Sequence, residues 1–126
     1  MRTPYDDKGF LAGRWVSLQA AASGAIFTLR TQRNAWIELA AAGLVIVAGW
    51  WWRVSAIEWA VIALTLGLIL ALEAINTAIE AVVDLVSPEH HPLAKIAKDA
   101  AAGALLLAVL ASLGVAVAIL GPRLYR

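Results

Sequence analysis

The chain has 126 residues, of which 62% are hydrophobic and 15% are charged, and its mean hydropathy is +0.78. This composition excludes an ordinary small soluble domain and indicates an integral membrane protein. Cysteine is absent, which excludes disulfides and thiolate chemistry, and the formal net charge of +1 gives no reason to expect nucleic-acid binding. A chain this short cannot enclose a large core once it is divided among membrane helices, so we expect a homo-oligomer.

The first helix is expected over residues 11–33, within a single domain that covers residues 1–126. This segment mixes apolar residues with polar ones, as is typical of an amphipathic helix lying at a membrane interface. The polar residues include Arg14, Gln19, Arg30 and Arg33.

Three apolar runs follow, and each is long enough to cross a bilayer as a helix: 35–52, 56–83 and 100–121. The first run ends in three tryptophans, a residue type that favours the lipid headgroup region. Ser87, Pro88 and Pro92 predict a break after the second run, so we expect a loop over residues 84–99. The predicted fold is therefore an all-α membrane protein with one interfacial helix and three transmembrane helices.

The distribution of lysine and arginine predicts the orientation of these spans. Five basic residues precede the first span, whereas Arg53 alone separates the first span from the second. Because cytoplasmic flanks carry an excess of basic residues, we expect the N-terminus and the 84–99 loop in the cytoplasm and the C-terminus outside. Arg123 and Arg126 argue weakly against this orientation.

An acidic stripe is predicted at the end of the second span. At about 100° per residue, Glu73, Asn76, Glu80 and Asp84 fall within an arc of about 80° on one helix face. A carboxylate at mid-membrane costs roughly 2.5–3.5 kcal/mol, and neighbouring carboxylates repel one another. Divalent cations would offset these costs, since Mg²⁺ takes oxygen ligands from one or two carboxylates and from substrate phosphates.

Lys98 and Asp99 follow beside the predicted loop, where an ammonium group and helix amides could contact phosphate. The layout is that of a phosphoryl-transfer site. Neither G-x-x-x-x-G-K-[ST] nor G-x-G-x-x-G occurs in the chain, so neither usual phosphate-binding loop is expected.

The segment EAINTAIEAVVD, followed by EHHPLAKIAKD, resembles the signature of the small prokaryotic diacylglycerol kinase family, which includes undecaprenol kinases. The similarity is dense over residues 73–103, and the hydropathy pattern agrees over nearly the whole chain. The resemblance implies a homotrimeric enzyme of the inner (cytoplasmic) membrane with sites shared between subunits. It also implies transfer of the γ-phosphate of MgATP to the primary hydroxyl of a lipid alcohol.

The same resemblance implies roles for individual residues. Glu73 matches the general base that accepts the proton of the lipid hydroxyl, and Glu80 matches a metal ligand. Glu38, Asn34 and Glu73 match positions near the lipid substrate. The positions expected to contact ATP are Asn76, Glu80, Asp84, Glu89, His90, His91, Lys98 and Asp99.

Two positions depart from the family pattern. Gln32 stands where a second metal-binding glutamate is expected, and an amide offers a carbonyl oxygen without charge, so binding of two metals is in doubt. Trp36 stands where an arginine is common.

Alternatives remain for several of these residues. Glu73 could be a structural acid that forms a hydrogen bond across the oligomer. Glu38 could form a polar bond that holds two helices together. His90 and His91 could be ordinary loop residues, Glu58 could simply lie at the outer interface, and Lys95 could be a solvated loop charge.

A different class of function also remains open, because the acidic stripe could belong to a helical bundle that binds or conducts cations. Lys98 favours the kinase, since a cation path has little use for an ammonium group at that position. The acceptor could be diacylglycerol or undecaprenol, and the segment VDLVSPEHHPLAKIAKDAAAGA is somewhat closer to family members that phosphorylate undecaprenol.

Overall fold

The structure, a computed structural model, describes residues 10–125 and is entirely helical over this range apart from short connections. Its elements are α1 (Phe10–Thr31), α2 (Arg33–Trp51), α3 (Ala56–Val86), α4 (Pro92–Leu120) and the short 3₁₀ helix η1 (Gly121–Arg123). The predicted all-α class, with an N-terminal helix followed by three long helices, is confirmed.

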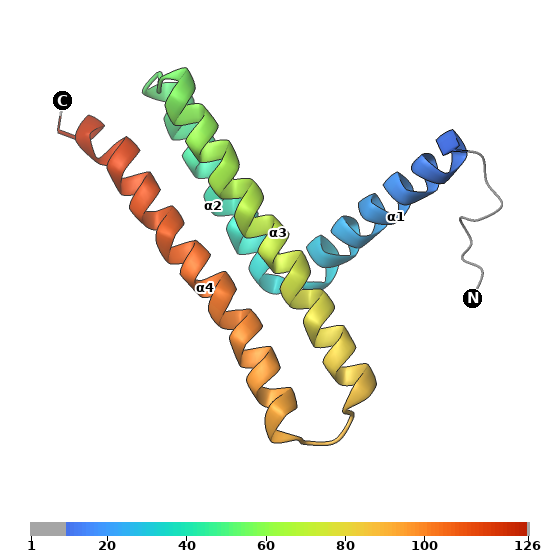
Figure 1. The fold of residues 1–126 in the computed structure, drawn as a ribbon. Helices are drawn as coiled ribbons and strands as arrows, with labels where there is room; N and C mark the ends of the chain where they lie inside the picture. Colours follow the sequence, from blue (N-terminus) through green and yellow to red (C-terminus); the bar gives the residue numbers. More distant parts are fainter. Residues whose placement is uncertain (1–9, 126) are drawn as a thin grey trace.

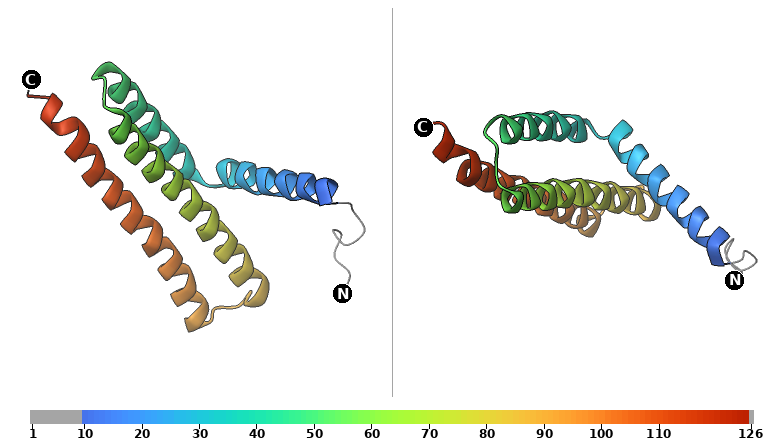
Figure 2. Two further views of the ribbon diagram at one scale, coloured as in Figure 1. Left: turned by 45° about the horizontal axis from the view of Figure 1, so that its top comes forward. Right: turned by 90° about the horizontal axis from the view of Figure 1, so that it is seen from above.

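The three long helices run antiparallel to their neighbours along the chain (Figure 1). α3 and α4 lie side by side, and the turn between α2 and α3 is at the same end as the C-terminus. The connection between α3 and α4 is at the opposite end. α1 leaves the start of α2 at a wide angle and points away from the other helices (Figure 2).

Three helices of the described chain are long and apolar enough to cross a membrane: Asn34–Trp51, Ala56–Val86 and Pro92–Arg123. Their surfaces carry large apolar side chains that are mostly exposed, such as Leu44, Leu64 and Leu107. A water-soluble monomer rarely exposes so much apolar surface, whereas a bilayer or neighbouring membrane helices would cover it. The chain is therefore built as a membrane protein.

The N-terminal helix is confirmed, but its polar side chains do not share one face. Arg14 and Arg30 are separated by 16 positions and lie about 160° apart around α1 at 100° per residue. Hydrophobic and polar residues are consequently poorly segregated on α1, so the amphipathic pattern expected over residues 11–33 is weak.

The connection between the last two long helices is much shorter than the loop expected over residues 84–99. α3 continues to Val86 and α4 begins at Pro92, not at residue 100, so only residues 87–91 lie outside helices. Pro92 occupies the first turn of α4, where its missing N–H is not needed and its fixed φ suits the helix. The proline that was interpreted as a helix breaker thus begins a helix.

The opposite end of the bundle is held by a polar network around Glu58. Its carboxylate accepts a hydrogen bond from the backbone N–H of Ser55 at 2.7 Å and one from Arg123 Nη2 at 2.8 Å. The Ser55 hydroxyl in turn accepts from the Glu58 N–H, which completes a capping box at the start of α3. Glu58 therefore links the start of α3 to η1 and does more than lie at an interface.

The α2–α3 hairpin depends on a close approach at Gly49. A Cβ atom at this position would lie 3.1 Å from Cη2 of Trp59, whose ring packs on the buried cluster of Val54, Ile62 and Ile119. A larger side chain at this end of the hairpin would require the Trp59 ring to shift.

Gly49→Val is expected to lower the free energy of unfolding of the protein in detergent by about 1–3 kcal/mol. The methyl groups of the valine would overlap the indole of Trp59. Gly43→Val is the matched control on the same helix, since a Cβ there meets nothing within 4 Å. Thermal unfolding followed by circular dichroism compares the two. Equal transition temperatures would show that the hairpin can open at Gly49 without cost.

Candidate active site

The hairpin geometry sets the level of the acidic stripe along α3. α2 covers 18 residue steps between Trp51 and Arg33, and the same number of steps from Ala56 along α3 reaches Ala74. The remaining 12 residues of α3 extend beyond the start of α2 by about 18 Å (Figure 1). Glu73 therefore lies level with the α1–α2 junction, and the rest of the stripe lies beyond it.

The inner end of the stripe is buried. Glu73 is 1% exposed, and Asn76 and Thr77 are each 7% exposed. The Thr77 hydroxyl donates to the backbone carbonyl of Glu73 at 2.9 Å, whereas Glu73 Oε2 has no hydrogen-bond partner among the described residues. A buried carboxylate oxygen without a donor is costly, so Glu73 is a candidate functional group.

Asn76 connects the buried part of the stripe to its outer part. Its amide nitrogen donates to Glu80 Oε1 at 3.1 Å, which fixes the orientation of the half-buried Glu80 carboxylate. Its carbonyl oxygen Oδ1 is buried and accepts no bond from any described residue. Asn76 and Glu80 thus offer oxygen ligands next to each other on one helix face.

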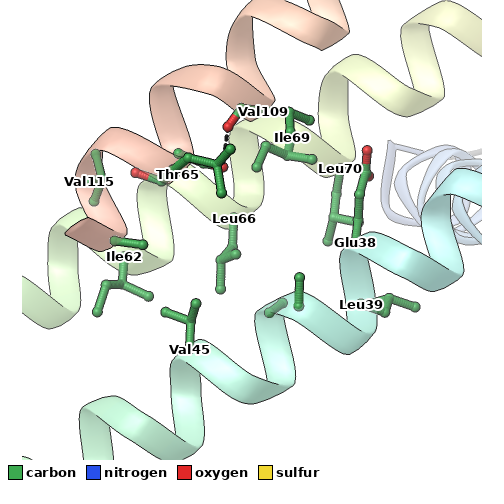
Figure 3. Close-up of a pocket in the computed structure, with 15 residues that line it drawn as sticks. Glu38, Leu39, Val45, Ile62, Thr65, Leu66, Ile69, Leu70, Val109 and Val115 are labelled. Atoms are coloured by element: carbon green, nitrogen blue, oxygen red, sulfur yellow. Dashed lines mark hydrogen bonds between the residues drawn. The ribbon is translucent and has the colours of Figure 1, made fainter. Parts of the chain in front are cut away.

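Glu38 reaches this region from α2. Its Oε2 atom is also buried without a partner in the described part of the chain. Figure 3 shows Glu38 beside Leu70, at one end of an apolar cavity of about 140 Å³ between α2, α3 and α4. The cavity thus combines a polar end at Glu38 with hydrocarbon walls.

The other two positions expected near the lipid and metal lie around the start of α2. Asn34 is exposed in the first turn. Gln32 is the N-cap residue of α2, with extended backbone angles, and its side chain makes no capping hydrogen bond.

The outer end of the stripe opens into a hollow of about 620 Å³ between the end of α3, the connection and the start of α4. Lys98 Nζ donates to Asp84 Oδ1 at 2.5 Å across these helices. Lys95 and Asp99 form a second ion pair one turn apart on α4. The structure thus brings together six residues expected to contact nucleotide, which all line this hollow: Asp84, Glu89, His90, His91, Lys98 and Asp99.

Two features of this end were missed from the sequence. Lys95 lines the hollow and pairs with Asp99, although it was interpreted as a loop charge. His91 caps α4, because its Nδ1 atom accepts a hydrogen bond from the backbone N–H of Leu93 at 3.2 Å. Both features follow from the start of α4 at Pro92. His91 is then the residue just before the helix, and Lys95 and Asp99 are four residues apart within it.

The protein groups alone do not form a complete metal site. No cluster of three or more His, Cys, Asp or Glu side chains suitable for a metal exists among residues 10–125. The Glu80 carboxylate and the free carbonyl oxygen of Asn76 are nevertheless hard donors of the kind that Mg²⁺ prefers. Such a partial set fits a cation that receives its other ligands from phosphate and water.

Comparison with known proteins agrees with this geometry. Residues 19–120 match the family described as prokaryotic diacylglycerol kinase. An undecaprenol kinase of Bacillus subtilis is 46% identical over 97 residues, covering 77% of this chain and 79% of that protein. A diacylglycerol kinase of Synechocystis is 46% identical over 110 residues, which are 86% of this chain but only 63% of the relative.

A diacylglycerol kinase of Escherichia coli is 36% identical over 85 residues, covering 62% of this chain and 70% of the relative. The family match includes every long helix and every residue of the acidic stripe. The chain belongs to the prokaryotic diacylglycerol kinase family.

Proposed function

We propose that this membrane lipid kinase transfers the γ-phosphate of ATP to the primary hydroxyl of a lipid alcohol, either diacylglycerol or undecaprenol. The kinase class rests on membership of the family and on the names of its relatives. The observation that carries the proposal is Glu73, whose buried carboxylate oxygen has no partner in the described chain. Along α3 it lies between Leu70, which lines the apolar cavity, and Val83, which lines the charged hollow.

Glu73 acts as the general base in this proposal. The lipid hydroxyl donates a hydrogen bond to the carboxylate, its oxygen attacks the γ-phosphorus, and Glu73 takes the proton as the bond to ADP breaks. The products are a lipid phosphate and ADP. Burial supports this role, because a carboxylate sheltered from water holds the hydroxyl in one orientation while the phosphoryl group transfers.

The lipid is proposed to enter from the membrane side. Glu38 and Asn34 lie on the first turns of α2, and Glu38 marks the polar end of the apolar cavity (Figure 3). A hydroxyl near Glu38 and Glu73 with a tail toward Ile62 and Val115 would satisfy both the polar and the apolar ends.

The triphosphate is proposed to occupy the hollow at the other end of the stripe. Lys98 supplies positive charge to the phosphates. The nucleotide is surrounded by the five other hollow-lining residues that were expected to contact it: Asp84, Glu89, His90, His91 and Asp99. A divalent cation, which we propose to be Mg²⁺, would be held by Glu80 and Asn76 and would neutralise charge on the phosphates. Gln32 could add only a neutral oxygen, so we propose weaker binding of a second metal.

We further propose a homotrimer in the inner membrane, with the N-terminus and the hollow in the cytoplasm and with α1 at the interface. The wide angle between α1 and the other helices supports an interfacial position for α1 (Figure 2). Because α3 extends past the level of α1, the hollow at the end of α3 would then project into the compartment that contains nucleotides. The mostly exposed apolar faces support packing with further copies.

Phosphate transfer from γ-labelled ATP in detergent micelles tests the activity, with diacylglycerol and undecaprenol offered separately, with and without Mg²⁺. We expect Mg²⁺-dependent labelling of at least one lipid, and labelling of both would indicate a site that selects the hydroxyl and tolerates either tail. The 46% identity to relatives of both names gives neither acceptor an advantage. Absence of labelling by folded protein would instead favour a cation-binding bundle.

A further inference from the structure

His91 occupies an unusual position for a histidine. It is the N-cap residue of α4, with extended backbone angles (φ −122°, ψ 133°), and its ring nitrogen Nδ1 accepts the N–H of Leu93 at 3.2 Å. Its backbone carbonyl accepts the N–H of Lys95 at 3.1 Å, which is the first main-chain bond of the helix. Serine, threonine, asparagine and aspartate are the usual residues here, because their side chains accept such bonds without titrating in the neutral range.

The cap requires an unprotonated Nδ1 atom. A neutral imidazole has one acceptor nitrogen, whereas a protonated imidazole has two donors and no acceptor. Protonation would also place a positive charge at the positive end of the α4 dipole. Protonation of the His91 ring would therefore remove this cap, whereas an asparagine cap would persist.

The first turns of α4 carry the cations of the hollow. Lys95 and Lys98 are four and seven residues after the cap, and Lys98 reaches Asp84 on α3 at 2.5 Å. The connection itself is only five residues long, and its other side-chain bond runs from the Ser87 hydroxyl to the Glu89 carbonyl at 3.1 Å. Fraying at the start of α4 would therefore move the two lysines relative to α3.

We propose that His91 is a positioning residue for nucleotide binding, whose neutral ring fixes the start of α4 and so holds Lys98 opposite Asp84. The proposal rests on the proposed binding of ATP in the hollow. It predicts that affinity for ATP falls as the ring becomes protonated. The other titratable groups that share the hollow with His91 come from α3, the connection and α4: Asp84, Glu89, His90, Lys95, Lys98 and Asp99.

These groups and ATP itself also titrate, so the test compares variants at each pH instead of interpreting one pH profile. His91→Asn keeps a side-chain acceptor and cannot take up a proton in this range, whereas His91→Ala removes the acceptor. His90→Asn is the matched control, because it removes the adjacent imidazole and leaves the cap in place.

The first measurement is amide hydrogen exchange at Leu93 in the full-length protein in micelles, corrected for the intrinsic effect of pH. Between about pH 8 and pH 5.5 we expect wild type and His90→Asn to lose protection about fivefold, whereas His91→Asn keeps it. Protection that is equally insensitive to pH in wild type and His91→Asn would overturn the proposal. This measurement needs no activity, so it stands even if the kinase assay fails.

The second measurement is KM for ATP over the same pH range. The ratio of wild-type KM to His91→Asn KM should rise about fivefold on acidification, and His91→Ala should show the raised KM already at pH 8. A ratio that does not change with pH would mean that the cap does not position the nucleotide site, even where exchange at Leu93 confirms the cap.

Discussion

Glu73→Gln is expected to reduce kcat for lipid phosphorylation by about 10²–10⁴-fold while KM for ATP stays nearly constant. The loss follows from the role of the carboxylate, because an amide can hold the lipid hydroxyl by a hydrogen bond but cannot accept its proton. Glutamine has almost the same shape as glutamate, and Glu73 Oε2 has no hydrogen bond to a described residue that the amide would break. Single-turnover phosphate transfer in micelles measures the chemical step directly.

Glu58→Gln is the matched control for this substitution. Glu58 is also on α3, but it lies at the opposite end of the bundle and bonds to Ser55 and Arg123. The control should lower thermal stability and leave kcat within about twofold, because a partly exposed ion pair contributes to stability on the order of 1 kcal/mol. If Glu73→Gln retained wild-type turnover, Glu73 would not be the base, and Glu38 would become the next carboxylate to test.

The helices were predictable because their signals are redundant. Uninterrupted apolar residues, the tryptophans at the end of the first span and the break near Pro88 all agree with the same three spans. The bounds were less accurate around Pro92, since a proline both ends a preceding helix and begins a following one. Only the capping geometry at His91 distinguishes these two outcomes, and it depends on the angles of the chain in three dimensions.

The acidic stripe was also predictable, because four positions on one continuous helix have a fixed angular relation. The sequence could not show that burial falls along it, from the enclosed Glu73 to the exposed Asp84. Burial depends on α2, which runs beside α3 only as far as about Ala74 and therefore covers the inner end of the stripe but not its outer end. The pairing of Lys98 with Asp84 was likewise hidden, since it depends on how a five-residue connection sets the register of α3 against α4.

Lys98→Gln is expected to raise KM for ATP about tenfold or more with little change in the helical fold. Lys98 bonds to the carboxylate of Asp84, so phosphate binding must share or replace this contact. A hydrogen bond to a charged group contributes about 1.5–3 kcal/mol, and the lower value corresponds to about a tenfold change in affinity. The lower value applies because the Lys98 side chain is 38% exposed.

Lys95→Gln provides the comparison that separates position from charge. It removes the same charge from the same helix, but the Lys95 side chain is 77% exposed and pairs with Asp99 on its own helix. We expect its KM for ATP to change less than about threefold, in line with the small contribution of exposed ion pairs. Equal increases in KM for the two variants would mean that the hollow attracts ATP by overall charge alone. A selective increase for Lys98→Gln would mean that the α3–α4 register, which sets Lys98 opposite Asp84, also sets where the phosphates bind.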